Sequence, residues 1–202
     1  MARAFADITF TPSVKAAQTR YHSREQNRGF ELAEDPRNVL TEMAAAFIAE
    51  RDSFYQATVA ENGWPYMQHR GGPKGFLKVL DEHTLAYADF RGNRQYLSVG
   101  NIAADERICL FLMDYANRRR LKIWGRASIR HEHDAPELIS TLTSSKYKAG
   151  IERVIIIRVE ALEWNCSKHI PQLFNEDEIR QILQPLIEEN DALKARLAKC
   201  ER

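Results

Sequence analysis

Residues 53–70 read SFYQATVAENGWPYMQHR, and this stretch decides the fold class. Its first part, 53–60, is rich in aromatic and β-branched side chains, which favour strands. The tripeptide ENG at 61–63 is a strong turn signal, and residues 66–70 then resume an extended pattern. The stretch therefore predicts a β-hairpin of two antiparallel strands.

More hairpins follow along the chain. Short polar turns join extended segments at 76–80 and 84–90 and at 107–114 and 119–130, and an apolar segment at 154–162 predicts a last strand. Short connections force antiparallel pairing, and sequential strands of this number tend to close into a small barrel without exposed edges. An open α+β sheet is the alternative, whereas a doubly wound parallel sheet is disfavoured because strands do not alternate with helices.

Helices are expected around these strands. Ser13 follows Pro12 and is placed to cap a helix at 13–20. Residues 38–50 carry apolar side chains at helical spacing, so one face of this helix should pack on the sheet. Shorter helices are expected at 95–104 and 134–143.

The C-terminal tail has a different pattern. Alternating steps of four and three residues separate Ile179, Leu183, Leu186, Asn190, Leu193 and Leu197, which is a short heptad-like seam. Pro185 is expected to start or kink the main helix. The seam fits a helix lying on its own barrel and equally a helix packing on a partner subunit. We expect a domain at 1–174 and a helical extension at 175–202.

Composition narrows the class of protein. The 29 basic residues nearly match the 28 acidic ones, so attraction to nucleic acid or to an anionic membrane is not expected. The first residues lack the apolar core of a signal peptide. Three cysteines, far apart and without CxxC spacing, suggest neither a disulfide framework nor a metal site. A cytoplasmic protein is expected.

The first of three basic clusters reads QHRGGPKGF at 68–76. Its adjacent glycines, Gly71 and Gly72, would let the backbone approach a ligand and offer N–H donors. Arg70 and Lys74 would bring positive charge to the same place. The alternative is a glycine-rich loop between two strands.

The second cluster, ADFRGNRQ at 88–95, runs from a strand into a helix. A helix N-terminus attracts phosphate through its N–H groups and dipole, and Arg91 and Arg94 would strengthen that attraction. Asn93 would cap the helix or donate from its amide. Ordinary capping beside solvated arginines is the alternative.

The third cluster, RRRLKIWGR at 118–126, lies on a predicted strand. Alternation places Lys122, Trp124 and Arg126 on one face, a basic and aromatic surface able to wall a flat heterocycle. A solvated basic face is the alternative. Together the clusters suit a ligand with an anion at one end and a flat ring at the other, as in FMN, although another phosphorylated heterocycle would fit as well.

Nearly the whole chain resembles the pyridoxamine 5′-phosphate oxidase-related FMN-binding proteins. The resemblance lies in YQATVAENGWPYMQHRGGPKGFLKVLDEHTLAYADFRGNRQYLSVGNI, LFLMDYANRRRLKIWGRASI, EWNCSKHI and the opening FTPSVKAAQTRYHSR. It implies a mainly β fold: a six-stranded antiparallel split β-barrel with peripheral helices, which forms a homodimer with FMN at the interface.

The resemblance also implies cofactor-binding residues, taken in chain order. The strand that meets the flavin carries His69, Arg70, Gly71 and Gly72, and Lys74 is added because of its charge. The phosphate binds after the next strand, at Asn93, Arg94 and Gln95. A later strand, often supplied by the other subunit, carries Lys122 and Trp124, and a C-terminal motif that closes the site contains Trp164, Asn165 and His169.

Two departures from pyridoxamine 5′-phosphate oxidase itself put vitamin B6 oxidation in doubt. Glycines at 71–75 interrupt the flavin strand, and a helical tail replaces the substrate-binding Arg-x-His ending. We expect an FMN-dependent oxidoreductase that uses a small-molecule substrate or a nicotinamide donor, with no residue identified as catalytic. The alternative is a non-catalytic flavin-binding or redox-sensing module.

Overall fold

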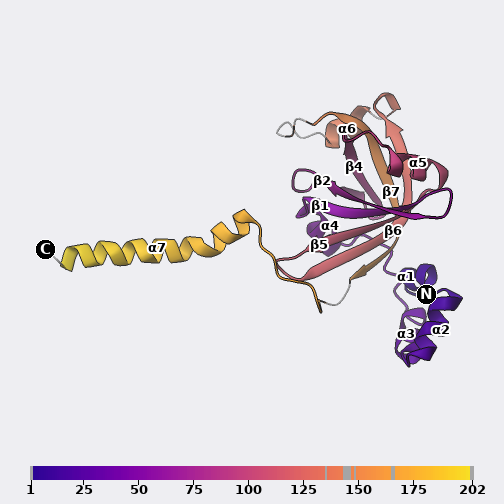
Figure 1. Cartoon of the computed structure of the whole chain (residues 1–202), viewed down its shortest axis with the longest axis horizontal. Helices are drawn as coiled ribbons and strands as arrows, with labels where there is room; N and C mark the ends of the chain where they lie inside the picture. The colour runs from indigo at the N-terminus through magenta and orange to yellow at the C-terminus, as the bar shows by residue number, and fades with distance from the viewer. Residues whose placement is uncertain (1, 135, 143–146, 148, 165–166, 201–202) are drawn as a thin grey trace. The chain divides into compact units, whose positions relative to one another are not determined.

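The structure is a computed structural model that describes every residue except 1, 135, 143–146, 148, 165–166 and 201–202 (Figure 1). It divides into two compact units. The first contains residues 1–113 and 120–166, and the second contains residues 114–119 and 167–202. The predicted boundary after residue 174 stays a prediction, and each unit is described by itself below.

One antiparallel sheet dominates the first unit. Its strands are β1 (Ser53–Val59), β2 (Pro65–Gly71), β3 (Lys78–Asp81), β4 (Thr84–Phe90), β5 (Arg107–Asp114), β6 (Arg119–His131) and β7 (Ile151–Trp164). They lie in the order β2-β1-β5-β6-β7-β4-β3. The fold is therefore mainly β and antiparallel as expected, but the expectation of a closed six-stranded barrel is wrong. The sheet has seven strands and stays open because β2 and β3 lie at its two edges.

The first hairpin confirms the turn expected at 61–63. Val59 of β1 faces Pro65 of β2 in the register, and the Ala60 N–H donates to the Trp64 carbonyl at 2.9 Å. Gly63 has a φ of +84°, which glycine adopts without steric cost. The turn sequence thus fixes the register of β2, and with it the face on which each β2 side chain lies.

The sheet curls around its core. Gln56 of β1 is buried and accepts a hydrogen bond from the hydroxyl of Tyr87 on β4, although several strands separate β1 from β4 in the sheet order. Burial raises the pKa of this hydroxyl well above its usual range. Apolar side chains from the inner face fill the space between, among them Phe54, Leu85, Leu110, Leu121, Ile123, Ile155 and Ile157.

Helices surround the sheet of the first unit. They are α1 (Ala4–Thr9), α2 (Pro12–Arg20), α3 (Arg24–Glu31), α4 (Glu42–Ala49), α5 (Leu97–Ala104) and α6 (Pro136–Leu142), with a single 3₁₀ turn at Glu132–Asp134. The expected cap Ser13 is wrong by two positions. Thr11 caps α2 by accepting from the Val14 N–H, because Pro12 takes the first helical position, where its missing N–H is harmless.

The second unit contains one long helix, α7 (Glu176–Cys200). Asn175 and Glu178 form a capping box at its start: the Glu178 N–H donates to Asn175 Oδ1 at 2.9 Å, and the Asn175 N–H donates to Glu178 Oε2 at 2.8 Å. The helix runs through Pro185 instead of beginning there. Across the described part of the chain, the helices are too short or too polar to cross a membrane.

Candidate functional site

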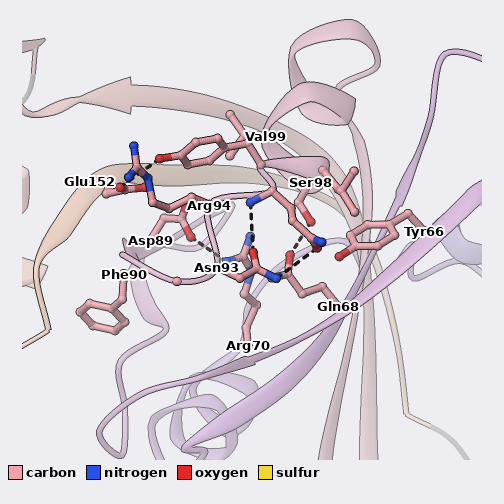
Figure 2. A pocket seen from close by; sticks show the side chains of 14 residues that line it. Tyr66, Gln68, Arg70, Asp89, Phe90, Asn93, Arg94, Ser98, Val99 and Glu152 are labelled. Atoms are coloured by element: carbon pink, nitrogen blue, oxygen red, sulfur yellow. Dashed lines mark hydrogen bonds and ion pairs between the residues drawn. The ribbon is translucent and has the colours of Figure 1, made fainter.

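A polar pocket of about 210 Å³ lies beside β2, the end of β4 and the start of α5 (Figure 2). The loop from β4 to α5 forms much of its wall, so the second basic cluster of the sequence lies here. The lining residues are Tyr66, Gln68, Arg70, Asp89, Phe90, Gly92, Asn93, Arg94, Gln95, Tyr96, Leu97, Ser98, Val99 and Glu152.

Strand alternation decides what β2 contributes to this pocket. Tyr66, Gln68 and Arg70 lie on one face of β2 and line the pocket, while Met67 and His69 lie on the opposite face. His69 there packs its ring against Tyr55 with centroids 5.6 Å apart. The predicted pair His69 and Arg70 is therefore divided between two surfaces.

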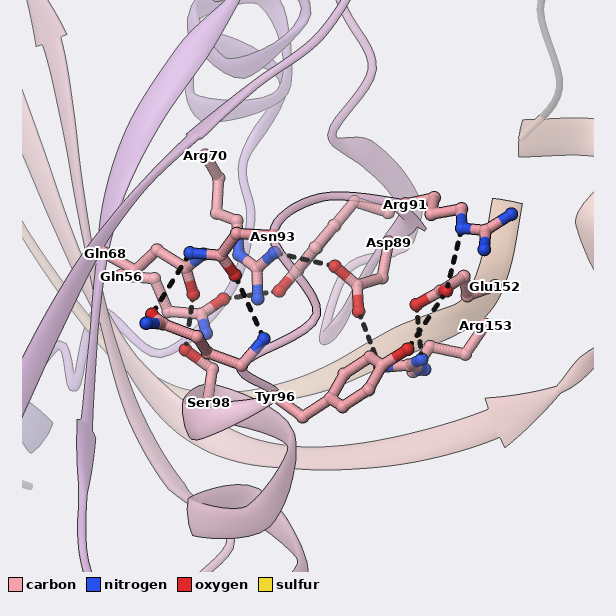
Figure 3. Close-up of polar contacts among 12 residues, drawn as sticks. Gln56, Gln68, Arg70, Asp89, Arg91, Asn93, Tyr96, Ser98, Glu152 and Arg153 are labelled. Carbon is pink, nitrogen blue, oxygen red and sulfur yellow. Dashed lines mark hydrogen bonds and ion pairs between the residues drawn. The ribbon is translucent and has the colours of Figure 1, made fainter. Parts of the chain in front are cut away.

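Arg70 is held by a carboxylate in the pocket wall (Figure 3). Its Nη1 donates to Asp89 Oδ1 at 2.6 Å, and Arg153 Nη1 approaches Asp89 Oδ2 at 3.3 Å. Asp89 is buried, and burial raises the pKa of its carboxyl against the opposing effect of Arg70 and Arg153. The two arginines thus compensate a carboxylate that is otherwise costly to bury.

Positive charge exceeds negative charge around the pocket. Glu152, the second carboxylate of the lining, accepts from Arg153 at 2.7 Å and lies 3.9 Å from Arg91. Each carboxylate therefore faces more than one guanidinium. The arginines in and behind the lining are Arg70, Arg91, Arg94 and Arg153, and the carboxylates are Asp89 and Glu152.

The loop between β4 and α5 is shaped by its own polar side chains. Asn93 Oδ1 accepts the Gln95 N–H at 3.1 Å, and Asn93 Nδ2 donates to Gln95 Oε1 at 3.1 Å. Arg94 and Tyr96 have φ angles of 64° and 54°, a left-handed conformation that non-glycine residues seldom adopt. Such local strain clusters at ligand sites, where the surrounding structure imposes it.

The first turn of α5 supplies N–H groups to the same pocket. Leu97, Ser98 and Val99 belong to the lining, and the first N–H groups of any helix lack partners within the helix. Ser98 is buried, and its hydroxyl donates to Gln68 Oε1 at 2.8 Å. The positive end of the helix dipole is therefore directed at the pocket, which suits a phosphate.

One buried donor atom of Arg70 lacks a hydrogen-bond partner among the described residues. This atom is Nε, whereas Nη1 is paired with Asp89. A buried donor without a partner is destabilising by about 1–3 kcal/mol. A phosphate oxygen in the pocket would satisfy it through a charge-assisted hydrogen bond.

A second, apolar hollow lies on the outer face of the sheet. It measures about 490 Å³ and is lined by Tyr55, Ala57, Met67, Cys109, Phe111, Lys122 and Trp124, from β1, β2, β5 and β6. The Lys122 ammonium lies 6.0 Å from the centroid of the Trp124 ring, and that ring stacks on Phe5. We call this surface the outer hollow. It contains Lys122 and Trp124 of the third cluster, which one chain alone does not bring to the polar pocket, whereas Arg126 pairs with Glu106 and Glu160 outside the hollow.

The glycines of the first cluster serve the chain's own packing. The Gly72 N–H donates to the Asp52 carbonyl at 2.9 Å, and a Cβ on Gly72 would lie 2.7 Å from Cγ of the Phe76 ring. Gly71 ends β2 opposite Ser53. Gly71 and Gly72 therefore lie outside the pocket lining, and the expectation of free glycine N–H donors fails for Gly72.

Lys74 does not bring its charge to Arg70. It is exposed and forms an ion pair with Glu50, just after α4, and it is absent from the pocket lining. The tight turn at Gly75, with a φ of +74°, carries the chain away from β2. A cofactor role for Gly71, Gly72 and Lys74 stays a prediction.

The described residues of the predicted C-terminal motif belong to both units. Trp164 ends β7 and packs edge-on against Phe47 of α4, with ring centroids 4.8 Å apart. Asn165 lies outside the described residues. His169 is an exposed residue of the second unit with a φ of 63°. The predicted closing role of these three residues stays a prediction.

Several lining residues were missed from the sequence. Tyr66 and Gln68 alternate with a period of two from Arg70, so strand alternation places them on the same face. Ser98 lies in the first helical turn after the basic loop, so its position in the sequence also indicates a lining residue. Glu152 and Arg153 precede the segment expected as the last strand, because β7 begins at Ile151. No signal in the sequence near Asp89 marks it as a lining residue.

Several known structures are similar to this chain at a low level. HupZ of Group A Streptococcus is 17% identical with a TM-score of 0.48, over 66% of this chain and 99% of that chain. An FMN-binding protein from Syntrophomonas wolfei is 13% identical with a TM-score of 0.49, over 76% and 97%. A protein of Clostridium acetobutylicum related to general stress protein 26, of the pyridoxinephosphate oxidase family, is 16% identical with a TM-score of 0.44, over 68% and 94%.

The curated proteins contain no match to this sequence. The family assignment comes from a family model described as pyridoxamine 5′-phosphate oxidase, which matches residues 40–167. This match covers more than half of the chain and includes every strand of the sheet together with the polar pocket and the outer hollow. The chain therefore belongs to the pyridoxamine 5′-phosphate oxidase family.

Proposed function

We propose that this protein binds FMN non-covalently and acts as an FMN-dependent oxidoreductase on a small-molecule substrate. The observation that carries the proposal is the buried Nε of Arg70, which has no partner among the described residues, in a pocket rich in arginine. Arg70, Arg94 and the first turn of α5 would hold the phosphate of the cofactor, and Asn93 and Gln95 would shape the loop around it.

The size of the pocket limits which part of FMN it takes. A cavity of about 210 Å³ is below the roughly 300–1,000 Å³ of sites that enclose a whole drug-sized ligand. The pocket therefore suits the phosphate end, and the isoalloxazine ring must extend beyond it. A ring outside the pocket needs a second wall to exclude water.

A second copy of the chain is the proposed source of that wall. The outer hollow is apolar, and it presents Lys122 and Trp124, the cation and aromatic side chain that a reduced flavin ring favours. Met67, which lines it, has an exposed fraction of 66%. A homodimer of split-barrel subunits would cover this surface and bring Lys122 and Trp124 of one chain to the cofactor held by the other.

FMN supplies hydride and electron transfer when it is bound, and the protein supplies binding, orientation and electrostatics. Among the described residues, the polar pocket is lined by arginine, amide, tyrosine and serine side chains and by the carboxylates of Asp89 and Glu152, which are paired with arginine. We propose that this lining anchors the phosphate, and that the surface across the interface contacts the reacting ring.

Turnover is the experiment that tests the enzyme proposal. Purified protein loaded with FMN is mixed anaerobically with NADH or NADPH, and bleaching of the flavin absorbance is followed before an electron acceptor is added. We expect reduction by one of the two nucleotides and reoxidation by the acceptor over repeated cycles. If the protein binds FMN stoichiometrically but neither nucleotide reduces it faster than free FMN, the protein would instead be a flavin-binding or redox-sensing module.

A further inference from the structure

The long helix α7 carries an apolar stripe that is exposed. The stripe follows a heptad in which the d positions are Ile179, Leu186 and Leu193 and the a positions are Leu183, Asn190 and Leu197. Its apolar members range from 43% exposed at Leu183 to 62% at Leu197. Pro185 lies inside the helix at position c, which is outside the seam.

Contacts within α7 itself stabilise its first turns. The capping box of Asn175 and Glu178 fixes its start, and Arg180 pairs with Glu176 at 2.5 Å one turn along. Gln184 donates to Glu188 at 2.8 Å on the outward side. The Gln184–Glu188 contact lies outside the seam, and the apolar stripe from Ile179 to Leu197 remains exposed.

Asn190 indicates which molecule the stripe takes. It is the one polar residue at the a positions between Leu183 and Leu197. In a parallel, in-register pair, a positions face a positions, so the two Asn190 amides would hydrogen-bond to each other. In an antiparallel pair, an a residue shares its layer with a d residue, which would leave the amide against leucine. A single asparagine at an a position specifies the register and the oligomeric state of a coiled coil.

The flanking charges favour the same partner. Glu189 occupies position g and Lys194 the next position e. In a parallel coil, a g residue faces the e residue of the following heptad in the partner, so Glu189 of each chain would face Lys194 of the other. Ile182 at g and Ile187 at e, both exposed, would meet in the preceding heptad and widen the apolar seam. Both contacts join two copies of this same helix.

We infer that α7 pairs with the α7 of a second copy of this chain as a parallel, in-register two-stranded coiled coil. The stripe, Asn190 and the Glu189–Lys194 pair are each self-complementary in that arrangement. The inference does not depend on a cofactor, because it uses only residues of the second unit.

Cysteine cross-linking of the full chain tests the inference. Leu186→Cys and Leu193→Cys are made separately in a chain whose native cysteines are replaced by serine, and the dimer formed in oxidised glutathione is followed on non-reducing gels. Both d positions should cross-link at least tenfold faster than Glu188→Cys, the control at outward position f. Cross-linking at only one d position would indicate an antiparallel pair, and rates equal to the control at both would mean no coil. Either result overturns the inference.

A charge exchange then tests the role of Glu189 and Lys194. Chains carrying Glu189→Lys or Lys194→Glu, each with Leu186→Cys, repel their own copies at this contact and complement each other. Mixed together, with a tag on one chain, they should give more cross-linked heterodimer than random pairing. A mixture of Glu188→Lys with the unaltered helix should pair at random. A statistical share of heterodimer in the exchange mixture would contradict the g–e contact and the parallel register.

Discussion

Arg70 of β2 donates through Nη1 to Asp89 of β4 at 2.6 Å, and this contact connects strands that lie near opposite edges of the sheet. It brings the basic end of the first hairpin to the loop that begins α5. Asp89 occupies Nη1, while the buried Nε of Arg70 has no hydrogen-bond partner among the described residues. The pair is thus the point at which the fold creates the proposed phosphate site.

The first prediction concerns Arg70. Arg70→Ala should raise the dissociation constant of FMN about 10- to 100-fold, because a hydrogen bond to a charged group contributes about 1.5–3 kcal/mol. Lys74→Ala is the matched control, since it removes the same charge nearby in the chain but outside the pocket. Fluorescence titration with FMN measures both. Equal affinities in Arg70→Ala, Arg94→Ala and the unaltered protein would refute the phosphate assignment.

The second prediction concerns the outer hollow. Met67→Asp places a charge in the apolar surface that a second copy is proposed to cover. It should therefore shift the monomer–dimer equilibrium of the first unit towards monomers. Leu80→Asp makes a similar change at an exposed leucine of the edge strand β3 and should have no effect. Light scattering measures the oligomer, with chains ending at residue 174 used so that α7 does not hold them together. A Met67→Asp protein that stays dimeric to the same dilution as Leu80→Asp argues against this interface.

The third prediction concerns the bulge between β6 and β7. The register shifts after Trp124, and a Cβ on Gly125 would collide with the Arg158 carbonyl oxygen. Gly125→Ala should therefore lower the free energy of unfolding by about 1–3 kcal/mol, as overpacking does. Gly100→Ala, in α5 with open space around its Cα, should be neutral or stabilising. Urea denaturation compares them, and equal midpoints for both variants would show that β6 and β7 do not approach this closely.

The fourth prediction concerns the turn between α5 and β5. Hydrogen bonds from the Arg107 side chain and backbone lower the pKa of Asp105 from 3.8 to about 2. A lowered folded-state pKa stabilises the fold above the unfolded value of 3.8, and this contribution is lost as pH falls towards about 2. Asp105→Asn should therefore melt below the unaltered protein at neutral pH, and the difference should shrink at about pH 2. Arg107→Gln should behave alike. A difference in melting temperature that stays constant with pH would show that the pair is not formed.

Much of the fold was predictable because its signals are local. Neighbouring residues determine the turn at 61–63 and the alternation along β1 and β2, and both predictions were confirmed. The same alternation had a consequence that motif reading overlooked. His69 and Arg70 are adjacent in sequence and must point to opposite faces of β2, so they cannot both line one pocket in one chain.

The remainder depends on contacts between distant segments. Nothing near Asp89 in the sequence indicates that Arg70 and Arg153 will meet it, since these contacts follow from how the sheet curls. The openness of the sheet has the same origin, because the pairing of edge strands is not encoded locally. Lys74 illustrates the converse: its charge suggested a ligand, but the turn at Gly75 directs it to Glu50.

The central claim is that the polar pocket binds the phosphate of a flavin. Titration of the protein with FMN and, separately, with riboflavin tests it most directly, because the two differ only in that phosphate. We predict stoichiometric FMN binding and at least tenfold weaker binding of riboflavin. A colourless protein that takes up neither, or one that binds both equally well, would contradict the claim.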